Sequence, residues 1–122
     1  MENNKKPNIL FIFTDQQYAG MLGCEDNPYV KTPNLDQLAN NGARLERAYC
    51  NNPVCVPSRF SMMTGIYPST IKMETNDHIG NIVPGEILSH SMGVLLGKSG
   101  YQTVYGGKTH LPGPEGVIND VT

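Results

Sequence analysis

The chain has 122 residues, with 9 Lys and Arg against 11 Asp and Glu, which gives a formal net charge of −2. This balance leaves no broad basic surface, so nonspecific binding to nucleic acid is not expected. The length suits one domain, and 39% hydrophobic with 16% charged residues excludes a disordered or fibrous protein. The 13 Gly and 9 Pro indicate many turns and a site built from loops.

The longest apolar run covers only residues 9–13. A spanning helix needs about 20 apolar residues and a signal-peptide core about 7–15. We therefore expect no membrane span and, by default, a cytoplasmic protein, or a periplasmic or secreted one if an export signal has been removed. The three cysteines cannot all pair, and the spacing of Cys50 and Cys55 gives little support to a zinc or iron–sulfur cage, so free thiols are expected.

In chain order, the first predicted element is a strand. Residues 8–14 form an apolar run without alternation, which is typical of a strand covered on both faces of an α/β sheet. A helix is predicted over residues 32–39, with Thr32 as its N-cap and Gly42 after its end. A short strand is predicted over residues 43–49.

A second helix is predicted where a proline follows a loop. It would begin at Pro57, run over residues 58–64 and end at Gly65. Residues 67–85 carry several Gly and Pro without periodicity, so this segment is predicted to be irregular.

A third helix is predicted from a single apolar stripe, which Gly100 would end. The residues spaced at helical intervals are Leu88, Met92, Leu95 and Leu96. Residues 101–105 are predicted to form a strand. Alternating strands and helices favour an open parallel sheet, in which ligand sites gather at the carboxyl ends of the strands.

The first chemical cluster contains Cys55 and Arg59. A cysteine just before the start of a helix lies in a field that favours a thiolate or a bound anion, and an arginine one turn later suits a tetrahedral oxyanion. A buried structural cysteine, with Arg59 in a surface salt bridge, is an equally good interpretation of these residues alone. A thiolate phosphatase is excluded because its arginine lies six positions after the cysteine, where Ser61 stands here.

The second cluster contains Lys108 and His110. Gly107 and Lys108 imitate the end of a phosphate-binding P-loop, but Gln102 stands where that motif needs a glycine. In an extended segment, alternate residues share a side, so Lys108 and His110 can face one ligand. The alternative is that both are solvated loop residues.

The third cluster is the pair Asp15 and Gln16, directly after the first predicted strand. Their oxygens suit Ca²⁺ or Mg²⁺, but two ligands are too few for a complete site. Taken alone, the pair is better explained as part of a turn.

Together these clusters resemble the N-terminal part of the type I, formylglycine-dependent sulfatases of the alkaline phosphatase superfamily. The matching segments, in the same order and with similar spacing, are Asn8–Gln17, Cys55–Arg59 followed by Met63–Gly65, and Gly100–Thr103 followed by Gly107–Leu111. The resemblance implies an α/β fold, here the N-terminal part of a mostly parallel sheet flanked by helices.

The resemblance also implies a set of site residues. Cys55 would be converted to formylglycine, whose hydrated aldehyde is the nucleophile. Arg59 would hold the formylglycine hydrate, while Lys108 and His110 would contact the sulfate or the nucleophile. A divalent cation, most often Ca²⁺ with Mg²⁺ as the alternative, would be bound by Asp15, Gln16 and residue 55. Gln16 stands where many members of the family have a second aspartate.

The resemblance further implies a substrate and a partner. The substrate would be a sulfate ester such as a sulfated sugar, and a formylglycine-generating or anaerobic sulfatase-maturating enzyme would convert Cys55. Sulfatases complete their metal site from a later segment, so residues 1–122 are expected to be a partial catalytic domain, inactive alone, with exposed apolar edges. The alternatives are a phosphonate or phosphodiester hydrolase of the same superfamily, or a catalytically silent fragment.

The remaining cysteines and histidines receive no catalytic role. Cys24 and Cys50 are interpreted as structural thiols, and His78 as a satisfied loop histidine, with contact to the substrate as the alternative. His90 is assigned no function.

Overall fold

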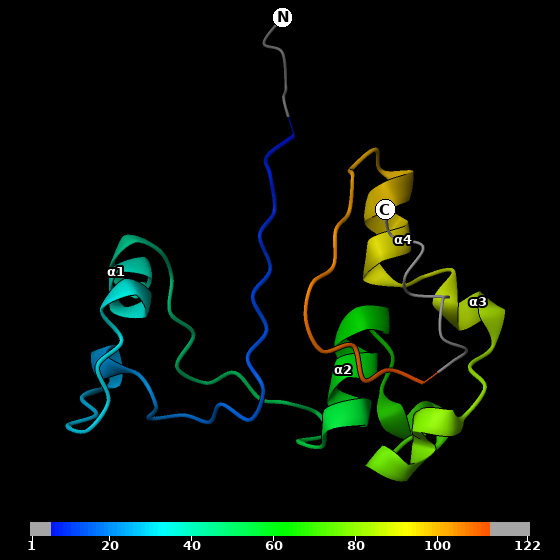
Figure 1. The fold of residues 1–122 in the computed structure, drawn as a ribbon, viewed down its shortest axis with the longest axis horizontal. Helices are drawn as coiled ribbons and strands as arrows, with labels where there is room; N and C mark the ends of the chain where they lie inside the picture. The colour runs from blue at the N-terminus through cyan, green and yellow to red at the C-terminus, as the bar shows by residue number, and fades with distance from the viewer. Residues whose placement is uncertain (1–5, 113–122) are drawn as a thin grey trace, which may run out of the picture. The chain divides into compact units, whose positions relative to one another are not determined.

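The computed structural model describes residues 6–112, which divide into two compact units between Arg47 and Ala48. The first unit contains the 3-10 helix η1 (Gly23–Glu25) and the helix α1 (Pro33–Asn41), both visible in Figure 1. Among the described residues, no helix is long and apolar enough to cross a membrane.

A small polar network joins η1 to α1. The Thr32 hydroxyl accepts a hydrogen bond from the Gly23 amide (2.8 Å) and donates one to Asp36 Oδ1 (2.8 Å). The same carboxylate oxygen accepts the Cys24 amide at 2.9 Å. A side chain at position 23 would collide with the Asp36 carboxylate, so a larger residue there would have to displace that carboxylate from its network.

The network shifts the ionisation of both of its titratable side chains. The hydrogen bond from Thr32 holds the pKa of Asp36 below its usual value of 3.8. For the Cys24 thiol, burial raises the pKa, and the neighbouring Asp36 raises it further. Because the fold favours the ionised carboxyl, Asp36 stabilises the first unit above about pH 4, and this contribution is lost as the pH falls through the lowered pKa.

We expect Thr32→Val to raise the pKa of Asp36 towards its usual value, because valine cannot donate to the carboxylate. Titration of the Asp36 carboxyl carbon by NMR measures this shift directly. Thr75→Val, the same substitution in the other unit, should leave the titration unchanged. An Asp36 titration that is the same in Thr32→Val and the parent protein would contradict the role given to the hydroxyl.

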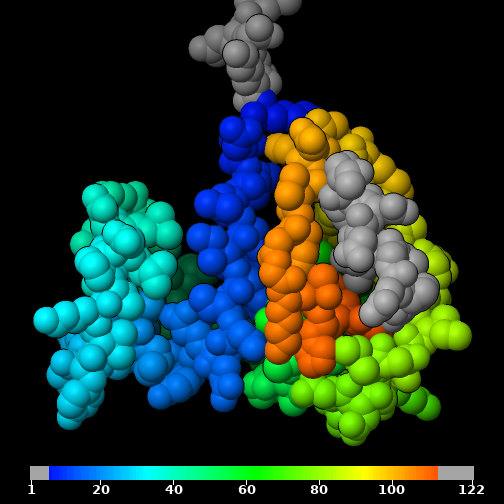
Figure 2. Space-filling model, viewed as in Figure 1, coloured from blue at the N-terminus to red at the C-terminus, as the bar shows by residue number. Residues whose placement is uncertain are grey.

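The second unit is built around α2 (Cys55–Thr64). The elements that follow it are the 3-10 helices η2 (Pro68–Ile71) and η3 (Asn76–Gly80) and the helices α3 (Gly85–Leu88) and α4 (Met92–Lys98). Helix α2 packs against η2, η3 and α4. In Figure 1 the segment after residue 100 crosses in front of α2, and in Figure 2 its atoms lie on the viewer's side of the second unit. Arg59 of α2 donates a hydrogen bond to Lys108 in this segment.

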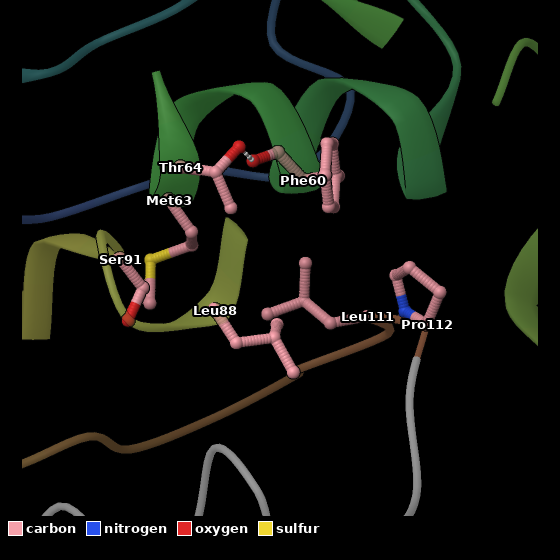
Figure 3. Close-up of a pocket in the computed structure, with 7 residues that line it drawn as sticks. All are labelled: Phe60, Met63, Thr64, Leu88, Ser91, Leu111 and Pro112. Atoms are coloured by element: carbon pink, nitrogen blue, oxygen red, sulfur yellow. Dashed lines mark hydrogen bonds between the residues drawn. The ribbon is translucent and has the colours of Figure 1, made fainter. Parts of the chain in front are cut away.

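The core of the second unit is small and apolar. Its buried side chains are Val56, Phe60, Met73 and Val83, with Ile66, Ile71, Ile87, Leu88 and Leu111 packed around them. A mostly apolar pocket lies beside this core (Figure 3), lined by Phe60, Met63, Thr64, Leu88, Ser91, Leu111 and Pro112. The core thus anchors the buried face of α2, the helix that begins with Cys55.

The observed helices correct two of the predictions. Helix α2 begins at Cys55, not at Pro57, so Pro57 occupies the third helical position. The stripe predicted as one helix is divided between α3 and α4, because the chain turns at residues 89–91. The predicted ends at Gly42, Gly65 and Gly100 are confirmed, and the last two glycines adopt positive φ values of 71° and 84°.

The predicted strands do not form within residues 6–112. Residues 8–14 run as an extended trace (Figure 1), but Leu10 is 85% exposed and Ile12 is 67% exposed. Residues 43–49 and 101–105 also lack strand pairing. A strand is defined by backbone hydrogen bonds to a neighbour, and the described residues supply no such neighbour to these segments. The sheet is therefore not seen in this part of the chain.

Candidate active site

The candidate nucleophile occupies a defined position at the start of a helix. Cys55 is the first residue of α2 and is half-buried. The preceding segment is fixed by Asn52, whose Oδ1 accepts the Val54 amide at 3.2 Å. A side chain at this position lies in the positive field of a helix N-terminus, which stabilises negative charge.

Arg59 connects α2 to the loop that carries the second predicted cluster. Its side chain is only 5% exposed, and Nη1 donates a hydrogen bond to the Lys108 carbonyl oxygen at 2.8 Å. The Tyr105 hydroxyl donates to the same oxygen at 2.6 Å. This carbonyl is therefore held from two sides, which fixes the backbone of Lys108 against α2.

The Lys108 side chain reaches the start of the helix. Its Nζ lies 3.8 Å from Cys55 Sγ, although the two residues are 53 positions apart in the sequence. The structure therefore brings together Cys55, Arg59 and Lys108. An ammonium group and a helix N-terminus converge on residue 55, an arrangement suited to a negatively charged group.

His110 lies on the same loop as Lys108, in an unusual backbone conformation. Its φ is 44°, and Gly107 nearby has a φ of 104°. The His110 Nδ1 atom is buried and has no hydrogen-bond partner among residues 6–112. Left-handed residues other than glycine are concentrated at functional sites, where the surrounding structure maintains the strain.

Asp15 and Gln16 lie in the first unit, so their position relative to Cys55 is not defined. Both are exposed, and Gln16, like His110, has a positive φ, here 54°. Their oxygens suit Ca²⁺ or Mg²⁺, but Ca²⁺ takes about six to eight oxygen ligands. No three His, Cys, Asp or Glu side chains gather as a metal site within residues 6–112. The described residues therefore do not form a complete cation site.

Sequence reasoning missed three residues that position this site: Asn52, Asn76 and Tyr105. Asn76 Oδ1 accepts the Val56 amide across 20 positions. Helix caps are recognised from residues next to the helix, so no local signal marks Asn76 as a partner of α2.

Comparison with known proteins identifies the family. The family model described as Sulfatase matches residues 7–113. The chain belongs to the sulfatase family. The resemblance inferred from the three motifs is thereby confirmed.

Three sulfatases illustrate the similarity. "Uncharacterized sulfatase YidJ" of Escherichia coli (strain K12) is 42% identical over 109 residues, covering 89% of this chain and 21% of the relative. "Ulvan-active sulfatase" of Formosa agariphila is 44% identical, covering 88% and 20%. "N-acetylgalactosamine-6-O-sulfatase" of Bacteroides thetaiotaomicron is 36% identical, covering 94% and 23%. No solved structure gives a significant match.

The chain spans about one-fifth of the length of these sulfatases. Membership of the family implies an alkaline-phosphatase-like α/β fold, whose sheet is not seen among residues 6–112. Sulfatases generally use a formylglycine and a divalent cation.

Proposed function

We propose that the protein carrying this chain is a sulfuric ester hydrolase whose nucleophile is a formylglycine made from Cys55. The observation that carries the proposal is the convergence of Lys108 Nζ on Cys55 Sγ, at 3.8 Å, at the N-terminus of α2. A sulfate ester places negative charge on its oxygens, and this charge grows on the leaving oxygen during hydrolysis. Preorganised positive groups lower the energy of that transition state.

Each residue of the site has a distinct proposed role. The formylglycine at position 55 would supply, as its hydrate, a nucleophile that can be regenerated after each turnover. Lys108 would pair with the sulfate oxygens, since its ammonium already lies beside residue 55. Arg59 would fix the loop through the Lys108 carbonyl and add positive charge. His110 would contact the sulfate or the nucleophile.

We further propose that Asp15 and Gln16, together with residue 55, contribute to binding of a divalent cation. Calcium is preferred to magnesium because it accepts more oxygen ligands in less regular geometry. The remaining ligands would come from outside the described residues, so residues 1–122 would be the N-terminal part of a catalytic domain.

The proposed substrate is a sulfated sugar, and the proposed partner is a maturation enzyme. Two of the relatives are named for 6-O-sulfated amino sugars, "N-acetylgalactosamine-6-O-sulfatase" and "N-acetylglucosamine-6-O-sulfatase". A formylglycine-generating or anaerobic sulfatase-maturating enzyme would act on Cys55 before the site is functional.

The test is to coexpress the complete gene product with each type of maturation enzyme and to assay aryl sulfates, sulfated amino sugars and aryl phosphonates. Peptide mass measurement around Cys55 should show a loss of about 18 Da on conversion of the thiol to the aldehyde nucleophile. Turnover of sulfate esters supports the proposal. Preferential turnover of phosphonates would favour a phosphonate hydrolase instead, and a converted protein without turnover would indicate a catalytically silent one.

A further inference from the structure

The residue at the N-cap position of α2 cannot cap the helix through its side chain. The N-cap residue is Val54, whose side chain offers no acceptor, and Pro57 at the third helical position has no N–H. The first hydrogen bond of the helix runs from the Ser58 amide to the Val54 carbonyl at 2.9 Å. The Val56 amide precedes that bond and needs an acceptor from elsewhere.

Asn76 supplies this acceptor. Its Oδ1 accepts the Val56 amide at 2.9 Å, from the first residue of η3. Val56 is completely buried, so water would be a poor replacement if Asn76 were removed. When a buried amide loses its acceptor, the free energy needed to remove the amide from water is no longer offset by a hydrogen bond.

Asn52 joins the same two segments from the other side of Cys55. Its Oδ1 accepts the Val54 amide at 3.2 Å, while its Nδ2 donates to the Glu74 carbonyl at 3.2 Å. Two asparagine side chains therefore hold the backbone immediately before and after Cys55 against residues 74–76. We call this arrangement, formed by Asn52 and Asn76, the asparagine clamp.

The far side of the clamp is itself fixed by a histidine. His78 Nδ1 accepts the Glu74 amide at 3.0 Å and the Thr75 amide at 3.5 Å. The imidazole thus closes the turn that presents Asn76 to α2. This contact gives His78 a structural role and agrees with its interpretation as a satisfied loop histidine.

We propose that Asn76, acting with Asn52, is a positioning residue that holds residue 55 at its distance from Lys108 and Arg59. Neither asparagine is assigned contact with the substrate, so both act through the backbone of residues 54–56. The catalytic consequence rests on the proposed function, whereas the clamp itself does not. Without Asn76 the first turn of α2 would fray, and misplacement of a nucleophile lowers the rate of reaction.

The clamp is tested first by hydrogen exchange in the complete gene product. Asn76→Ala should speed exchange of the Val56 amide about tenfold, the equivalent of one ordinary hydrogen bond. Asn76→Asp should retain the protection, because a carboxylate oxygen can accept the same amide. Asn81→Ala, an exposed asparagine just after η3, is the matched control and should leave exchange unchanged. Unchanged exchange in Asn76→Ala would overturn the clamp.

The catalytic part is tested by steady-state kinetics of the matured protein. Asn76→Ala should lower kcat about tenfold with little change in KM, because the loss concerns the geometry of the nucleophile. Asn76→Asp should recover kcat relative to Asn76→Ala. An unaltered kcat in Asn76→Ala, or equal losses in both variants, would overturn the positioning role. If the parent protein does not hydrolyse sulfate esters, the proposed function fails, and the exchange experiment still decides whether the clamp exists.

Discussion

The Cys55→Ala variant should lose sulfate-ester hydrolysis entirely, because alanine removes the atom from which the proposed nucleophile is made. Cys55→Ser should behave differently. A serine hydroxyl in the same place can accept one sulfuryl group but has no second hydroxyl to expel sulfate. We therefore expect at most one equivalent of product per molecule of Cys55→Ser, measured as a burst of the aryl alcohol without steady turnover.

The control for this experiment is another cysteine of the same chain. Cys24 is a half-buried free thiol in the first unit, and Cys24→Ala should retain turnover and conversion at residue 55. Turnover that survives in Cys55→Ala would refute the proposed nucleophile. Steady turnover by Cys55→Ser would show that regeneration of an aldehyde is not needed, and would refute the formylglycine mechanism.

The elements predicted best from sequence are those with local signals. Gly42 and Gly65 end α1 and α2 as expected, since a glycine after an apolar helix face is a strong stop. Helix α2 begins two residues before the start predicted at Pro57. Its N-terminus is satisfied by Asn76, 20 residues after Val56, and nothing next to the helix indicates this.

The apolar run over residues 8–14 shows why a segment with the pattern of a strand does not always form one. Its composition indicates a preference for burial, but burial requires other segments to cover it and pair with it. Within the described residues those neighbours are missing, and Leu10 remains 85% exposed. An apolar sequence pattern predicts that a segment tends to be buried as a strand. The neighbouring segments determine whether it is buried and paired.

For the candidate site, the sequence indicates which residues belong to it but not how they contact one another. The motifs identified Cys55, Arg59 and Lys108 because their residue types and order are those of sulfatases, and the three lie together. The hydrogen bond from Arg59 to the Lys108 backbone could not be predicted, because a side-chain pattern carries no information on which carbonyl it meets. The meeting of Asp15 and Gln16 with residue 55 stays a prediction.

Lys108→Met should reduce kcat/KM for sulfate esters by about 10²–10³, the loss typical of one preorganised contact to a developing negative charge. Methionine keeps most of the length of the side chain and removes only its ammonium group. Because the Lys108 side chain is exposed, the free energy of unfolding should change little, within about 0.5 kcal/mol. Kinetics and urea unfolding of the same preparation separate the two effects.

Lys98→Met is the matched control, because Lys98 is also exposed. Among the contacts described, its Nζ donates only to the Ser89 carbonyl, at 3.4 Å. The control should keep the kcat/KM of the parent protein.

A Lys108→Met enzyme that is equally active would contradict a direct role of the ammonium at the sulfate. Lys108 would then act only through its backbone carbonyl. Arg59 and Tyr105 donate hydrogen bonds to this carbonyl regardless of the side chain at position 108. Arg59→Met should in that case still impair activity, because it removes one of the two hydrogen bonds that fix this carbonyl and the loop that faces residue 55.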